Sequence, residues 1–187
     1  MNLSDLTFKT LMRHIHKLKE GSPTLACEML QELLTTRLVD AENQEWIEQA
    51  LITRIWISTT IDESADSVES LQSLLTSLFS DLTKPLSAAS IHAAQVLLWK
   101  KVEFFFAQSL WDKTSTWCRL ALHSIFRNAG DLNKAKILRK IMACAISKSD
   151  FNTAQDAFEE MAEEVRAEPL TLYLMFKMAA RSGQTEL

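Results

Sequence analysis

The sequence predicts an all-α fold, a right-handed α-solenoid of about nine stacked helices. Apolar residues recur at i, i+3, i+4 and i+7 along most of the 187 residues, which is the period of a helix with one buried stripe. The three glycines and three prolines all fall at expected helix boundaries, which leaves little room for a β-sheet. We expect one helical-repeat domain over residues 1–187, with N-terminal helices over 1–84 and repeat-like helices over 85–187.

The N-terminal region predicts four helices. Gly21 follows the first helix as a left-handed stop, and Pro23 opens the second. Asp66 and Glu69 form a capping box at the start of the fourth. The expected helices span 4–19, 24–38, a segment that includes 46–56, and 66–82.

The C-terminal region predicts five more helices. Pro85 opens the longest of them, and the turn Ser149-Asp150 separates the seventh from the eighth. The expected helices span 86–109, 112–128, a pair on either side of the Ser149-Asp150 turn, and 169–181. We expect the last helix to bury Leu172, Met175, Phe176 and Ala179.

Small and large residues alternate in the pair of helices around Ser149. Ala154 is small where two helices must approach closely, and Phe158 fills the space one turn later. This pattern is typical of tetratricopeptide-like helix pairs. Thr114 and Cys118 replace the favoured alanine and tyrosine in the preceding pair, and the spacing exceeds the roughly 34 residues of a regular repeat. The predicted repeats are therefore degenerate, with an insertion near 125–131.

Charge and composition exclude several classes of partner. Twenty basic against 24 acidic residues give a net charge of −4, which disfavours direct nucleic-acid binding. No apolar run approaches the roughly 20 residues that a membrane span needs, so we expect a soluble intracellular protein. Cys27, Cys118 and Cys144 are isolated in apolar patterns, as small buried residues of a reducing compartment are.

The sequence offers no catalytic constellation. His14 and His16 stand two residues apart on a helix, so their side chains point to different sides of it. No third ligand stands at a suitable offset, so we expect no metal site there. His92 has no supporting group nearby, and a Cys118–His123 pair lacks the strained turn and orienting group of a nucleophile. We therefore expect no enzyme activity, cofactor, metal or small-molecule substrate.

Charged residues gather on the seventh and eighth expected helices. We favour solvated faces joined by ion pairs over a charged binding groove, because solenoid helices carry charge wherever they meet water. The basic set is Lys134, Lys136, Arg139 and Lys140, and the acidic set is Glu159, Glu160, Glu163 and Glu164.

Aromatic residues crowd the segment 99–117, and one helix face cannot bury all of them. Most are expected in the core. Phe104 and Trp111 fall off the main apolar stripe, so we predict that they bind a protein partner as exposed aromatic anchors. Arg119 is expected to bind an acidic segment of that partner.

Several C-terminal segments carry a family resemblance. They are Leu97-Leu98-Trp99-Lys100-Lys101, the segment 117–123 that begins Trp117-Cys118-Arg119, the segment 133–140 that begins Asn133-Lys134-Ala135-Lys136, the segment 168–177 that begins Glu168-Pro169, and Ser182-Gly183. In this order they resemble the meiotic crossover scaffold family of the sporulation-specific protein twenty-two or Zip-four type, to which testis-expressed protein eleven is related. The resemblance covers roughly the last half of the chain, and residues 1–86 match only the general helical architecture.

The resemblance implies a nuclear, chromosome-associated hub. It implies a non-catalytic scaffold that assembles meiotic recombination or synapsis proteins. Family members are much longer, so the chain is expected to be an N-terminal fragment or a short relative, with its last helix covered by missing repeats or by a partner. The alternative is a generic tetratricopeptide-like adaptor that binds a peptide or helix of a non-meiotic partner.

Overall fold

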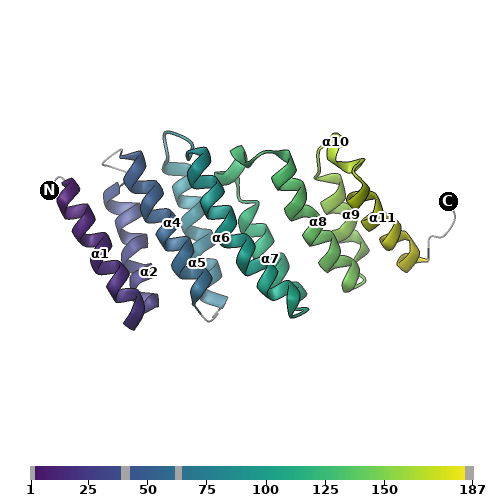
Figure 1. Cartoon of the computed structure of the whole chain (residues 1–187), viewed down its shortest axis with the longest axis horizontal. Coiled ribbons are helices and arrows are strands. Elements are labelled where there is room, and N and C mark those ends of the chain that lie inside the picture. The colour runs from purple at the N-terminus through teal and green to yellow at the C-terminus, as the bar shows by residue number, and fades with distance from the viewer. Residues whose placement is uncertain (1–2, 39–42, 62–64, 184–187) are drawn as a thin grey trace. The chain divides into compact units, whose positions relative to one another are not determined.

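The computed structural model describes residues 3–38, 43–61 and 65–183, and it shows no strand in those ranges. Helices follow one another along the chain (Figure 1). The all-α prediction is confirmed. Two compact units, Met1–Leu97 and Leu98–Leu187, divide the chain within a single helix, α6.

The first unit begins with α1 (Asp5–Gly21), α2 (Pro23–Glu32) and a π-helical turn, η1 (Leu33–Leu38). They are followed by α4 (Gln44–Thr60), α5 (Ala65–Asp81) and the start of α6 (Ala88–Ala107). Gly21 is the last residue of α1 and does not adopt a positive φ, so the predicted left-handed stop is wrong. Ser22 ends the helix instead. The capping box predicted at Asp66 involves a side chain outside the described residues.

The core of the first unit forms where α2 packs against α1 and α4, and where α5 packs against α4 and η1. Phe8 is buried and stacks on the Trp46 ring with centroids 4.9 Å apart. Arg54 is also buried, and its guanidinium donates to Ser58 and, at 3.1 Å, to Ser70. Burial lowers the pKa of Arg54, and the neighbouring Cys27 partly opposes that effect.

The start of α6 is fixed by a carboxylate from α4. Glu48 accepts hydrogen bonds from the Ser87 backbone N–H at 2.7 Å and from the Ser87 and Ser90 hydroxyls at 2.6 Å each. Gln44 donates to the same carboxylate at 2.9 Å and to the Pro85 carbonyl at 3.3 Å. Helix α6 therefore begins at Ala88 after a serine cap, and not directly after Pro85 as predicted.

The second unit contains the rest of α6 and the helices that follow it. Their bounds are α7 (Trp111–Ala121), a 3-10 segment η2 (Ser124–Ala129), α8 (Asp131–Ser147), α9 (Phe151–Glu159), α10 (Glu163–Arg166) and α11 (Pro169–Ser182). The predicted helix over 112–128 is too long. It ends at Ala121 because His123 adopts an extended conformation, and His123 Nδ1 accepts the Ile125 N–H at 3.2 Å.

Helix α8 is the centre of the second unit and contacts α7, α9, α10 and α11. Its predicted stripe is buried, and Ala154 of α9 is fully buried, as expected for a close helix approach. The predicted inner face of the last helix is wrong. Leu172 and Phe176 are 54% and 62% exposed, whereas Thr171 and Leu174 are buried.

Two identical turns join α6 to α7 and α8 to α9. Ser109 and Ser149 adopt left-handed φ angles of 59° and 60°. In the first turn the Leu110 N–H donates to the Phe105 carbonyl at 3.1 Å, and the Ser109 N–H donates to the Phe106 carbonyl at 3.0 Å. The second turn repeats both bonds, at 2.9 Å and 3.2 Å. This is the Schellman pattern with serine where glycine is usual.

The cap of α6 makes stability depend on pH. Burial raises the pKa of Glu48, but the hydrogen bonds from Ser87, Ser90 and Gln44 outweigh burial and leave the pKa below its ordinary value. The stabilisation is complete above the unfolded-state pKa of this carboxyl and is lost as the pH falls through the lower folded-state pKa. We expect Glu48→Gln to reduce the free energy of unfolding by about 1 kcal/mol at neutral pH.

Urea unfolding followed by circular dichroism, from neutral to acidic pH, tests this expectation. The difference between wild type and Glu48→Gln should shrink toward acidic pH. Glu32→Gln, at an exposed position of α2, should have little effect. Equal destabilisation by Glu48→Gln at every pH would show that the carboxylate charge is not what stabilises the cap.

The left-handed serine at the α8–α9 turn predicts a second stability effect. A β-branched side chain is strained in this conformation, so Ser149→Val should reduce the free energy of unfolding by roughly 1–2 kcal/mol. Ser149→Gly should preserve or increase it, because glycine adopts positive φ freely. Ser147→Val, at the end of α8, is the matched control for loss of a hydroxyl. Equal effects of the valine and glycine variants at position 149 would contradict the prediction.

Candidate partner-binding surface

The three residues predicted to bind a partner have different surroundings in the second unit. Phe104 is 57% exposed and meets the Phe105 ring edge-on, with centroids 5.3 Å apart. Trp111 is half-buried at the start of α7, and its ring packs on Phe106 at 5.3 Å. Arg119 is exposed. None of the contacts among the described residues joins one of the three to another, so each is a separate candidate.

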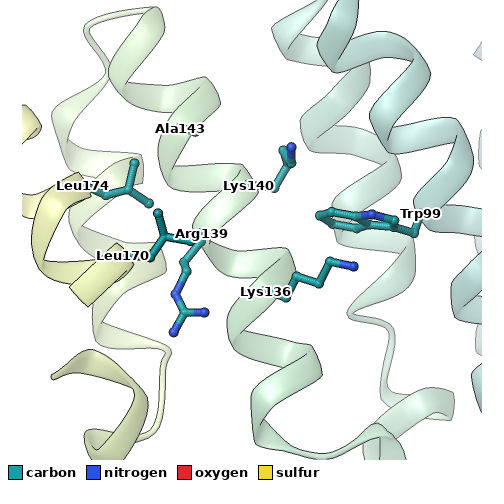
Figure 2. A pocket seen from close by; sticks show the side chains of 7 residues that line it. All are labelled: Trp99, Lys136, Arg139, Lys140, Ala143, Leu170 and Leu174. Atoms are coloured by element: carbon teal, nitrogen blue, oxygen red, sulfur yellow. The ribbon is translucent and has the colours of Figure 1, made fainter. Parts of the chain in front are cut away.

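A pocket that the sequence did not reveal lies in the same unit, with a volume of about 290 Å³. Three helices contribute to its wall (Figure 2). The lining residues are Trp99 of α6, then Lys136, Arg139, Lys140 and Ala143 of α8, then Leu170 and Leu174 of α11.

The helical period explains why these residues share the pocket. Arg139 and Lys140 lie three and four residues after Lys136, and Ala143 lies four and three residues after them, which places all four on one stripe. That stripe lies opposite the buried stripe of α8, which includes Leu138 and Met142. Leu170 and Leu174 are likewise one turn apart on α11. The spacing on α8 was visible in the sequence, but the approach of Trp99 and α11 required the tertiary fold.

Two lysine side chains contact the Trp99 indole in the pocket wall. Lys136 extends from α8 toward the Trp99 ring (Figure 2). The Lys136 Nζ lies 4.1 Å from the ring centroid, and the Lys140 Nζ lies 5.3 Å from it and 3.8 Å from the Phe106 centroid. Each such cation–π contact stabilises the arrangement by about 0.5–1 kcal/mol at exposed sites.

Two of the three cations of the pocket already have carboxylate partners. The Lys140 Nζ is 2.9 Å from Glu103 Oε1, and Arg139 Nη2 is 2.5 Å from Glu168 Oε2. Lys136 is exposed, and among the described residues its recorded contact is with the Trp99 ring alone. One ammonium at the mouth of the pocket therefore remains available to an anion.

Arg139 also determines where α11 lies. Its Nε donates to Thr171 Oγ1 at 2.7 Å, and its Nη2 donates to the Val165 carbonyl at 3.3 Å. The Thr171 hydroxyl in turn donates to the same Val165 carbonyl at 2.9 Å. These bonds turn Thr171 and Leu174 inward, and they explain why Leu172 and Phe176 point outward.

Of the four predicted acidic residues, Glu160 is the one for which ion pairs are observed among the described residues. Glu160 lies 3.3 Å from the Lys134 Nζ and 3.6 Å from Arg119 Nη1. Glu163 and Glu164 belong to α10, so the predicted acidic edge is divided between two helices. Exposed pairs of this kind stabilise a fold by less than about 1 kcal/mol each.

The thiols and His123 lie in environments that disfavour nucleophilic chemistry. Burial raises the pKa of Cys118 far above its ordinary value and raises the pKa of Cys144 to about 11. Burial lowers the pKa of His123, whose Nδ1 accepts the Ile125 N–H. Thiols with such pKa values remain protonated and unreactive at neutral pH.

The described part of the chain offers neither a cluster of metal ligands nor a membrane-spanning helix. In residues 3–38, 43–61 and 65–183, no group of three or more histidine, cysteine, aspartate or glutamate residues could hold a metal ion. Within the same residues, every helix is too short or too polar to span a membrane.

The chain matches a known family and a curated relative. The model of a family described as "Meiosis protein SPO22/ZIP4 like" matches residues 1–123. Sporulation-specific protein 22 of Saccharomyces cerevisiae is 23% identical over 182 residues, which cover 96% of this chain and 18% of the yeast protein. The chain thus spans less than a fifth of that relative. No solved structure matches the chain significantly.

The location of the family match corrects one expectation. The matched residues include the whole N-terminal region, for which the sequence predicts only the general helical architecture. Of the segments that carried the resemblance, only those up to His123 lie within the match. Because the family model covers more than half of the chain, the chain belongs to the SPO22/ZIP4-like family of meiosis proteins.

Proposed function

We propose that the chain is a non-catalytic scaffold that holds meiotic recombination or synapsis proteins together on chromosomes in the nucleus. The observation that carries this proposal is the family match over residues 1–123. The yeast relative, by its name a sporulation-specific protein, supports it. The net charge of −4 favours attachment to chromosomes through protein partners over direct contact with DNA.

The scaffold is proposed to be a right-handed solenoid of degenerate tetratricopeptide-like pairs. The identical turns at Ser109 and Ser149 support this arrangement, because they join α6–α7 and α8–α9 in the same way. Thr114 and Ala154 follow these serines at the same distance, and both are fully buried. The η2 segment lies between the two pairs, where the sequence predicts an insertion.

Exposed aromatic residues support binding of protein partners. Phe104, Tyr173 and Phe176 are each more than half exposed, and aromatic residues are enriched at protein interfaces. We propose Phe104, Trp111 and Arg119 as partner-binding residues. Helical-repeat surfaces present side chains from several helices in this way and bind without turnover.

A generic adaptor outside meiosis is the second candidate. The pocket beside Trp99 is equally consistent with this candidate, because a site of this size suits a peptide side chain whatever the partner. The two candidates differ in partner identity and not in mechanism.

Affinity capture tests the meiotic assignment. The tagged chain, expressed in meiotic and in mitotically dividing cells, is recovered and its partners are identified by mass spectrometry. We expect recombination and synapsis proteins in the meiotic sample, and reduced recovery with Phe104→Ser relative to the control Leu132→Ser, a similarly exposed position of α8. Recovery of chaperones or cytoplasmic proteins alone would contradict the meiotic role and favour the generic adaptor.

Thiol labelling tests the absence of nucleophilic chemistry. Cys118 and Cys144 should react with iodoacetamide at neutral pH only after unfolding in urea, because burial holds both thiols protonated. Peptide mapping by mass spectrometry would report the modified residues. Rapid labelling of Cys118 in the folded chain, lost in a His123→Ala variant, would indicate an activated thiol and revive an enzymatic role.

A further inference from the structure

We propose that the pocket between α6, α8 and α11 binds an acidic segment of a protein partner. The segment inserts one large apolar side chain between Trp99 and Leu174 and places a carboxylate beside Lys136. The inference rests on the proposed scaffold function and describes its partner by chemistry.

The size and lining of the pocket indicate an apolar anchor. Its volume of about 290 Å³ lies at the lower limit of the roughly 300–1,000 Å³ typical of small-molecule sites. The lining is mostly apolar, and Ala143, Leu170, Leu174 and the Trp99 ring contribute to it. A single leucine or aromatic side chain fits such a space, and its burial stabilises a complex by removing apolar surface from water.

The charges at the mouth of the pocket indicate an acidic neighbour for that anchor. Lys140 and Arg139 are paired with Glu103 and Glu168, so a new carboxylate cannot reach them without breaking an ion pair. Lys136 can accept one without such a loss, since its ammonium contacts only the Trp99 ring among the described residues. A basic segment would meet this free cation and be repelled, although the chain as a whole is acidic.

The wall of the pocket is held in place before any partner arrives. Arg139 fastens α11 to α8 through Thr171, Glu168 and the Val165 carbonyl, which positions Leu170 and Leu174. A site held by such bonds loses less conformational entropy when it binds. Leu170 and Tyr173 are each 57% exposed and lie one turn apart on the same side of α11. A bound segment can therefore extend from the pocket along that side of the helix.

Selection from a phage library of random peptides identifies the preferred ligand without assumptions about sequence or direction. The library is selected on the whole chain, and enriched peptides are synthesised with a fluorescein label for anisotropy titrations. We expect enrichment of peptides that combine one large apolar residue with aspartate or glutamate. Enrichment of basic or entirely polar peptides, or no enrichment, would overturn the inference.

Variants of exposed residues locate the binding site without disturbing the core. Lys136→Glu and Leu170→Ser should each weaken binding of the selected peptide about tenfold or more. Their matched controls are Lys17→Glu on α1 and Leu172→Ser, an equally exposed leucine on another side of α11, and both should bind as wild type does. Wild-type affinity in the Lys136→Glu and Leu170→Ser variants would overturn the assignment.

Fluorine NMR reports directly on the indole of the wall. In a chain labelled with 5-fluorotryptophan, the Trp99 signal is assigned by its loss in Trp99→Phe. Addition of the peptide should shift this signal and leave that of Trp46 in the first unit unchanged. A shift of the Trp111 signal without one at Trp99 would place the peptide elsewhere. Self-association that Lys136→Glu abolishes, measured by sedimentation, would identify a second copy of the chain as the occupant and overturn the proposal.

The outcomes separate this inference from the proposed function. Selective peptide binding without capture of meiotic proteins would support the pocket and contradict the meiotic role. Capture of meiotic proteins at wild-type levels by both Lys136→Glu and Leu170→Ser, together with a negative selection, would support the scaffold and overturn the pocket as its binding site.

Discussion

The arrangement of the last helix depends on one guanidinium. Arg139 projects from α8 on the stripe opposite its buried side, and its side chain is only 12% exposed. A planar group with fixed donors can hold a hydroxyl, a carbonyl and a carboxylate at once, and here all three belong to the segment from Val165 to Thr171. The inner side of α11 is therefore selected by polar geometry as well as by apolar burial. Both the pocket wall and the exposed aromatic face follow from that choice.

Polar hydrogen bonds likewise determine where α6 begins. Glu48 satisfies the Ser87 backbone N–H and two serine hydroxyls from a helix more than thirty residues earlier in the chain. Helix ends leave donors unsatisfied, and a carboxylate near the N-terminus also complements the helix dipole. A long-range cap of this kind fixes where α6 begins.

The chemistry of the second unit favours recognition over catalysis. Its thiols are buried and protonated, while Lys136 and Lys140 contact the half-buried ring of Trp99 at the pocket. Aromatic residues and cations near apolar pockets are the features that protein interfaces concentrate.

The sequence by itself determined the all-helical class, most helix positions and the burial of the main stripes, because helical periodicity and helix-ending residues are local properties. It also predicted the family, although the matched region includes N-terminal helices in which no motif was evident. It failed at the end of α7, where the His123 cap replaces a continuing helix, and at the inner face of α11. Only the tertiary structure decided that face and brought Trp99, Lys136 and Leu174 to one pocket. The physical reason is that Arg139 and Glu48 act on groups far away in sequence, and no local pattern reveals which distant donors and acceptors a side chain will meet.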